Sequence, residues 1–295
     1  MATVATRARL DWRGLASRHW PLWLGIIAIT VPTFISLARG PWSLESGVHG
    51  PIVLATGLWL VFRRLPELKG KFVPGDRLVT GLMLAVAVPL YAFSRAFDFI
   101  SLEVAAWLLA MVAVGYAYAG GAILRSMWFP IFYLAFIIPV PGWILDVVTQ
   151  PLKILVSEVV TYILTAFGYP IARIGVTLYV ANYQLLVEDA CAGLNSLVSL
   201  SAIGLFYVYM LRGSNWRYSL LLLALVVPIA IAANIVRVLA LVLITYHFGD
   251  AAAQGYLHNS AGMVTFTSAL LFIFLIDKLL TPVRNALASP GEKAS

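Results

Sequence analysis

Three residues of the types that acyl transfer needs follow one another in the second half of an otherwise apolar chain. The only cysteine, Cys191, lies in the run VEDACAGLNS, Arg237 interrupts the apolar run IAANIVRVLALV, and His258 opens the run HNSAG. A thiolate can attack a carbonyl carbon, a buried cation can stabilise the resulting oxyanion, and histidine can move a proton near neutral pH. These residue types suggest a thioester-forming site, provided that the fold brings the three side chains together.

Cys191 precedes an apolar run, which predicts that it stands at the N-terminal end of a helix. The free backbone N–H groups and the dipole of such an end favour a thiolate. The neighbouring acids Glu188 and Asp189 disfavour it. Gly193 lets another backbone or a substrate chain approach closely. The alternative is a buried, unreactive structural cysteine.

Arg237 lies about nine residues, or roughly 13 Å, from the predicted outer end of its apolar run. An arginine within a membrane span is costly and by default indicates function. Asn234, three residues earlier on the same helix face, is placed to orient it. The alternative is an arginine that extends to the interface or pairs structurally with an acid.

His258 shares a helix face with Gly262, so a neighbouring helix can pack closely there. Histidine in this position can serve as the general base. The alternatives are that His258 is only a polar cap at the interface, or that His247 is the base. His247 ends the preceding apolar run and fits an interface position better.

The composition places these residues in a membrane. Of 295 residues, 61% are hydrophobic and only 11% are charged, whereas soluble domains carry about 25% charged residues. The mean hydropathy is +0.91. The chain is predicted to be a single all-α polytopic membrane domain, residues 1–295, with about eight transmembrane helices that each cross roughly 30 Å of hydrocarbon. These spans are expected at 21–38, 51–62, 78–97, 102–120, 124–140, 192–211, 218–246 and 259–280.

The basic residues predict the orientation of these spans. Fifteen of the 20 Lys and Arg fall on the side of the N-terminus, four fall on the opposite side, and Arg237 lies within a span. This bias predicts cytoplasmic tails at 1–20 and 281–295. Five spans occupy 21–140, and a three-span catalytic core occupies 191–280. Cys191, Arg237 and His258 then all lie toward the outer side. Because the basic residues stand in short loops beside spans, we expect no nucleic-acid partner.

The segment 141–190 differs from the spans and is expected on the outer face. Residues 143–168 mix apolar and polar positions, which indicates an amphipathic helix at the membrane interface. Residues 174–187 are rich in β-branched and aromatic side chains, which predicts an extended segment outside the lipid, just before the sixth span. One cysteine forms no intramolecular disulfide, and four histidines without a Cys/His cluster argue against zinc. We therefore expect no metal and no cofactor.

The motifs CAGLNS, NIVRV and HNSAG together resemble those of the exosortase/archaeosortase family, over residues 125–280. The resemblance points to a bacterial exosortase, of the alphaproteobacterial type. The chain departs from the family at Ala192, where serine is more frequent. The resemblance implies a cysteine protease or transpeptidase of the bacterial inner membrane. Cys191 would be the nucleophile, Arg237 the oxyanion stabiliser and His258 the general base and acid.

The resemblance also implies the partners, besides membrane lipid. The substrates would be exported proteins that end in a short motif such as Pro-Glu-Pro, one hydrophobic span and a basic tail. The new carboxyl end would pass to an unknown acceptor nucleophile, in association with exopolysaccharide production. Two alternatives remain at this point. One is a transporter or channel in which Arg237 binds an anionic envelope precursor. The other is a scaffold without chemistry of its own.

Overall fold

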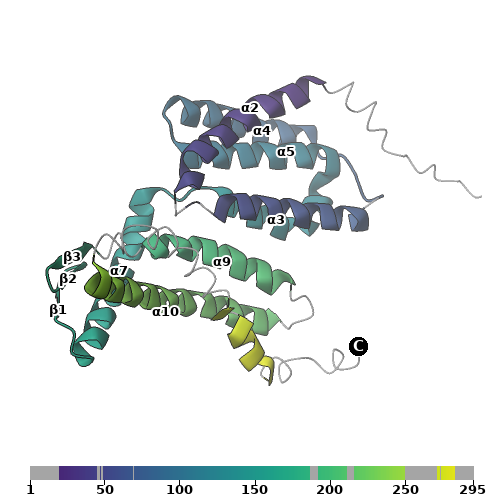
Figure 1. The fold of residues 1–295 in the computed structure, drawn as a ribbon. Helices are drawn as coiled ribbons and strands as arrows, with labels where there is room; N and C mark the ends of the chain where they lie inside the picture. Colours follow the sequence, from purple (N-terminus) through teal and green to yellow (C-terminus); the bar gives the residue numbers. More distant parts are fainter. Residues whose placement is uncertain are drawn as a thin grey trace, which may run out of the picture. The chain divides into compact units, whose positions relative to one another are not determined.

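The computed structural model describes two compact units, which divide after Pro139, at the end of the five predicted N-terminal spans (Figure 1). The first unit comprises Met1–Ser43 and His49–Pro139, and the second comprises Leu44–Val48 and Val140–Ser295. The structure describes residues 20–44, 47, 49–68, 70–186, 192–210, 216–249, 271–272 and 274–282.

The described residues of the first unit form five α-helices, most of which coincide with predicted spans. They are α2 (Trp20–Arg39), α3 (His49–Arg64), α4 (Arg77–Ala96), α5 (Ile100–Ser126) and α6 (Trp128–Leu134). Asp76 caps α4, because its side chain accepts hydrogen bonds from the backbone N–H groups of Leu78 and Val79, at 2.6 and 3.3 Å. α5 packs against α4 and α2, while α3 packs against α6.

Gly120 divides the long helix α5 at the place where the sequence separates two spans. Its backbone (φ 74°, ψ 172°) is non-helical and lies in a region that residues with a side chain rarely adopt. A Cβ atom there would collide with the carbonyl oxygen of Val73. The segment before α4 is held against this kink, since the N–H of Gly75 donates to the carbonyl of Ala117 at 3.2 Å. The predicted span 102–120 therefore ends at this glycine. The predicted span 124–140 is not one helix, because it comprises the end of α5, the short helix α6 and the 3-10 helix Ala135–Ile137.

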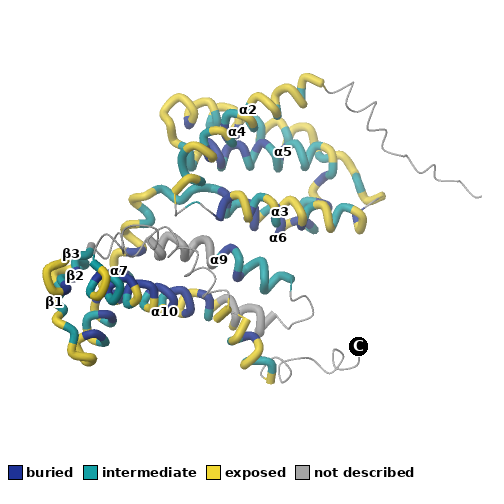
Figure 2. The backbone as a smooth tube through the Cα atoms, viewed as in Figure 1, coloured by how far each residue is buried: buried dark blue, intermediate teal, exposed yellow. Residues whose placement is uncertain are grey.

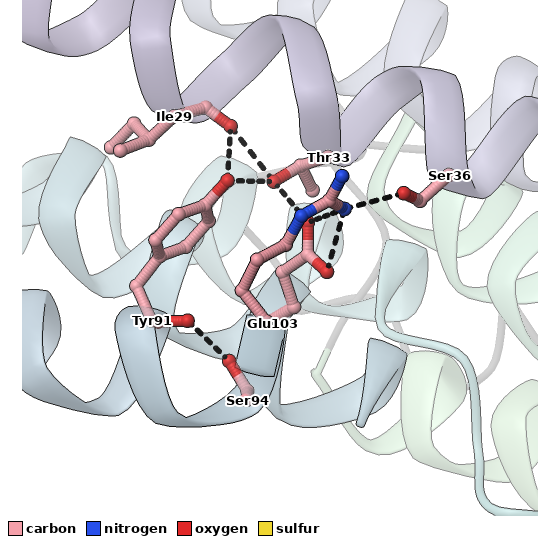
Figure 3. A network of polar contacts seen from close by, with 7 residues as sticks. Ile29, Thr33, Ser36, Tyr91, Ser94 and Glu103 are labelled. Atoms are coloured by element: carbon pink, nitrogen blue, oxygen red, sulfur yellow. Dashed lines mark hydrogen bonds and ion pairs between the residues drawn. The ribbon is translucent and has the colours of Figure 1, made fainter. Parts of the chain in front are cut away.

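A buried carboxylate joins three helices of the first unit (Figure 3). Glu103 of α5 is only 2% exposed. It accepts hydrogen bonds from the hydroxyl of Thr33 in α2 at 2.8 Å and from Arg95 in α4 at 3.1 Å. Arg95 also donates to Ser36 of α2 at 2.6 Å. Because a carboxylate in apolar surroundings needs such partners, this network fixes α2, α4 and α5 to one another.

Within its described residues, the second unit combines three long helices with a small antiparallel sheet. In chain order these elements are α7 (Gly142–Ala166), β1 (Ile171–Ile174), β2 (Thr177–Val180), β3 (Tyr183–Leu186), α9 (Ala192–Met210) and α10 (Trp216–Phe248). Figure 1 shows α9 and α10 side by side, with the start of α9 and the end of α10 toward the sheet, and α7 running across α10.

The extended segment predicted for 174–187 is a three-stranded sheet in the order β1-β2-β3, and it begins earlier, at Ile171. Two tight turns break the segment into hairpins. Gly175 (φ 62°) stands in the first turn, and Ala181 (φ 51°) stands in the second. An alanine with positive φ carries no clear sequence signal, and this explains why the segment was expected to be one extended stretch.

The core of the second unit lies where α7, α10 and the sheet meet. Leu178 and Val180 of β2 are fully buried, whereas the alternate residues of this strand are only partly buried. They pack against valine and leucine side chains of α7 and α10, namely Val156, Val160, Leu164, Val238, Leu241 and Val242. Figure 2 shows buried positions along α10, and they recur from Val226 to Thr245. This packing fixes the sheet to both helices.

The described residues include five helices that are long and apolar enough to cross a membrane: Trp20–Ser43, Arg77–Ala96, Ile100–Ser126, Gly142–Ala166 and Ala224–Phe248. The chain is therefore a mostly helical, polytopic membrane protein. The fourth of these is the helix predicted at the interface, and it is also long enough for a span. The predicted span 51–62 is the shorter helix α3, and 192–211 is α9. Most of the predicted span 259–280 lies outside the described residues.

Replacing Glu103 with glutamine should lower the stability of the purified protein in detergent by about 1–2 kcal/mol. Hydrogen bonds to charged groups contribute roughly 1.5–3 kcal/mol, and the partial exposure of Arg95 reduces this value. Thermal unfolding measures the loss. The matched control is Glu67→Gln, an exposed carboxyl in the same unit. Equal melting temperatures for the two variants would contradict a structural role of the network.

Candidate active site

Arg237 lies inside the second unit rather than at its surface. It is 5% exposed, and its neighbour Val238 belongs to the aliphatic core. Helix α10 continues to Phe248, so Arg237 stands eleven residues from the end of the helix, or about 16 Å. This is about half a turn deeper than the sequence predicts, because the helix runs two residues beyond the predicted span. The guanidinium is thus largely shielded from water, so its electrostatic interactions are stronger than at the surface.

Asn234 shares the buried face of α10 with Arg237. It is fully buried and lies three residues before the arginine, which puts both side chains on one face of the helix. Ala230 and Ala233, one turn earlier, are also buried and pack in a cluster that includes Tyr207 of α9. The face that carries the two polar residues is therefore the face directed toward α9.

The pairing of α9 with α10 sets the level at which α9 begins. Gly204 of α9 faces Val226 of α10 so closely that a Cβ atom at residue 204 would strike the valine side chain. α9 begins at Ala192, twelve residues before this glycine. Twelve residues beyond Val226 on the antiparallel helix is Val238, and both stretches measure about 18 Å. The first turn of α9 is therefore level with the turn of α10 that carries Arg237.

The described residues bring some of the predicted site together and leave other parts untested. Arg237 and Asn234 are buried on one face, and the first helical residue after Cys191 starts at the same level. Gly193 lies in the first turn of α9. Three predicted site residues lie outside the described residues and remain predictions: Cys191, His258 and Gly262.

His247, the rival candidate for the base, stands at the exposed end of α10. Its Nε2 lies 3.4 Å from the hydroxyl of Tyr169, and its ring meets the ring of Tyr169 edge to face. It also contacts Tyr246. His247 lies ten residues from Arg237, close to the end of the helix, and its contacts are those of a residue that joins α10 to the chain entering the sheet.

Sequence reasoning treated Lys153 as one charge of an interfacial helix, but the structure buries it. Lys153 of α7 is 7% exposed, and its Nζ lies 3.6 Å from the carboxylate of Asp146. Thr149 and Ser157, four residues before and after it, are also buried. This spacing of four puts three polar side chains on one face of α7. The same spacing is readable in the sequence and indicates a polar face directed into the protein.

A metal-dependent site finds no support within the described part of the chain, where no group of three or more His, Cys, Asp or Glu could hold a metal ion. The buried polar residues in this part of α10 are Asn234 and Arg237, an amide and a cation. The chemistry of this region is therefore that of a buried cation, suited to an anion or a developing oxyanion.

The fold and this site define a polytopic membrane protein that keeps a buried arginine beside the start of a helix. The family model described as "Transmembrane exosortase" matches residues 42–275, which include Cys191, Arg237 and His258. This match covers more than three quarters of the chain, and the chain therefore belongs to the transmembrane exosortase family. The match begins well before residues 125–280, where the motifs resemble the family, and it ends at residue 275. No curated protein and no solved structure matches the chain.

Comparing the stability losses of variants at Leu178 and Arg237 distinguishes a residue needed for packing from a residue needed for chemistry. Leu178→Ala should cost about 2–4 kcal/mol, because it opens a cavity in a fully buried position. Arg237→Lys should cost less than about 1 kcal/mol, since the charge and most of the aliphatic stem remain. Thermal unfolding in detergent measures both. A loss for Arg237→Lys as large as that for Leu178→Ala would assign Arg237 a structural role.

Proposed function

We propose that this exosortase is a membrane-embedded cysteine transpeptidase that cleaves exported proteins near a C-terminal sorting signal and transfers the new carboxyl end to an acceptor. The observation that supports it most strongly is that the start of α9 and Arg237 of α10 lie at the same height along the two paired helices. The first turn of α9, which directly follows Cys191 in the chain, is level with the buried Arg237 of α10. On this proposal, Arg237 is the cation that stabilises the oxyanion formed at Cys191.

In the proposed reaction, His258 takes the proton of the Cys191 thiol, and the thiolate attacks the scissile carbonyl carbon. The carbonyl π electrons move to the oxygen, and Arg237 stabilises this oxyanion. The C–N bond then breaks, His258 gives its proton to the leaving amine, and a thioester remains on Cys191. Water or an acceptor nucleophile attacks the thioester and releases the thiol. Water yields hydrolysis, and the acceptor yields transfer.

Arginine suits this role better than lysine does. Its planar guanidinium presents several N–H donors in a fixed arrangement, so two of them can reach one oxyanion. Burial strengthens the attraction, because little water screens the charge. Asn234, fully buried on the same helix face, orients the guanidinium. Gly193 and Gly262 allow close approach of the chains that surround the site.

We place the site on the outer side of the bacterial inner membrane, with about eight spans and both termini in the cytoplasm. The sheet supports this placement, because strands with open edges are unstable in lipid. Tyr169, just before the sheet, contacts Tyr246 near the end of α10, with ring centroids 5.2 Å apart. This end of α10 therefore faces water.

The substrate would carry a short motif such as Pro-Glu-Pro, a hydrophobic span and a basic tail, and would reach the cell surface together with exopolysaccharide.

Two buried cations favour a second candidate function, transport of an anionic envelope precursor. Lys153 and Arg237 both border the core cluster of the second unit. An anion that passes through the protein would use both charges. This function needs no thiol, so it would tolerate the loss of Cys191 and would fail when Arg237 is replaced.

Cys191→Ala and Cys191→Ser should abolish processing of an exported reporter that ends in a short motif, one hydrophobic span and a basic tail. Neither variant can form the thioester at a useful rate. Immunoblotting of reporter and enzyme measures processing at equal enzyme level. The matched control is Ala192→Ser, which changes the neighbouring residue and should retain processing. Normal cleavage by the alanine variant would contradict the proposed function.

Arg237→Lys should lower the rate of reporter processing by roughly 10²-fold or more, the usual effect of removing one oxyanion donor. The control is Arg125→Lys, an exposed arginine at the end of α5, which should process at the parent rate. An undiminished rate in Arg237→Lys would exclude the arginine as the oxyanion stabiliser. Loss of anion uptake in Arg237→Lys combined with full activity of Cys191→Ala would instead favour the transporter.

A further inference from the structure

The two edges of the sheet differ in how they are protected from further strand pairing. β1 follows Pro170 and carries Arg173, whose guanidinium pairs with Glu158 of α7 at 3.0 Å. β1 also packs against α7. Proline, charge and a covering helix are the common devices that protect an edge strand. The edge at β1 is therefore closed to an additional strand.

β3 forms the opposite edge and contacts α10, but the strand itself has neither of the first two devices. Its sequence, Tyr183–Leu186, contains neither a charge nor a proline. Among the described residues, β2 is the only strand that pairs with it. Tyr183 is 37% exposed, and Gln184 is exposed as well. An uncharged, exposed edge strand is a template for pairing with another extended chain.

The register shows which backbone groups of β3 are directed outward. The N–H of Ala181 donates to the carbonyl of Pro170. Because hydrogen bonding alternates along an antiparallel strand, Thr177 and Tyr179 also direct their backbone groups toward β1. The residues between them bond toward β3, in the pairs Val180↔Tyr183 and Leu178↔Leu185. Gln184 and Leu186 therefore present their N–H and C=O groups away from β2, at the open edge.

β3 is close in the chain to the proposed nucleophile and contacts α10, the helix that carries Arg237. Leu185 packs against the core cluster to which Val238 of α10 belongs, the residue next to Arg237. Leu186, the last residue of β3, is five residues before Cys191, and five residues span at most about 17 Å. A chain paired with β3 would therefore run next to the segment that bears the thiol.

We propose that the outer edge of β3 binds an extended segment of the polypeptide substrate as a fourth strand, through the backbone groups of Gln184 and Leu186. The proposal rests on the proposed function and adds how the substrate is held. Pairing through backbone groups recognises an extended chain with little dependence on its side chains, which suits an enzyme that acts on many exported proteins. It also holds the scissile bond in the extended form that attack requires.

A proline and alanine comparison at residue 184 tests the proposal on the full-length protein in cells. Gln184→Pro removes an outward N–H and leaves the bonds between β2 and β3 intact, whereas Gln184→Ala removes only the side chain. Gln184→Pro should process the reporter roughly tenfold more slowly than Gln184→Ala, the effect of about one lost hydrogen bond. At the opposite edge, Arg173→Pro and Arg173→Ala should process at equal rates.

The melting temperatures of the proline variants show whether a slower rate of processing results from misfolding. If Gln184→Pro unfolds at the parent temperature yet processes as fast as Gln184→Ala, the proposal is overturned. The proposed function then still stands, provided that Cys191→Ala abolishes processing. If Cys191→Ala processes normally, it is the proposed function that fails.

Photocrosslinking identifies what occupies the edge, even if Gln184→Pro proves unstable. A photoreactive amino acid at position 184 in the Cys191→Ala protein should crosslink to the uncleaved, epitope-tagged reporter. The same amino acid at position 173 should not. A crosslink from position 184 to a second copy of the enzyme would overturn the proposal, and so would the absence of any crosslink to the reporter.

Discussion

Arg237 carries its positive charge among packed helices of the second unit. The core cluster next to it is aliphatic. Such a charge is costly to bury, so the elements around it must supply both apolar packing and polar groups. α10 provides Asn234 on the same face, α7 and β2 provide the core that fixes the helix, and Gly204 brings α9 close. The level at which α9 begins follows from that packing.

The first unit also buries a charged side chain, but there the charge serves to join helices. Glu103 is as deeply buried as Arg237, and Thr33 and Arg95 from two other helices are its partners. These contacts tie α2, α4 and α5 together, which is a structural use of a buried charge. The contrast shows that burial alone does not make a charged residue catalytic. What distinguishes Arg237 is its level beside the start of α9.

Hydropathy predicted the helices well, since an apolar run of sufficient length in lipid has few alternatives to a helix. α2, α4, α9 and α10 begin and end within two residues of the predicted spans. The break at Gly120 and the turn at Ala181 were not predicted, because they depend on positive φ angles that the sequence marks weakly. The contact between Glu103 and Thr33 joins residues 70 apart, which local patterns do not reveal.

For the site, Arg237 and Asn234 were recognised as an unusual polar pair in an apolar run, and both are buried. Lys153 was missed because its helix was interpreted as interfacial. The roles of Cys191 and His258 remain predictions, as both lie outside the described residues.

The central claim is that a thioester forms at Cys191, and intact-protein mass spectrometry tests it most directly. The purified enzyme would be mixed with the reporter, quenched in acid and weighed. The account predicts an added mass equal to the acyl part of the cleaved reporter, located on the peptide that contains Cys191 and released by hydroxylamine. Reporter cleavage without any adduct on Cys191, under conditions that preserve a synthetic thioester, would contradict it.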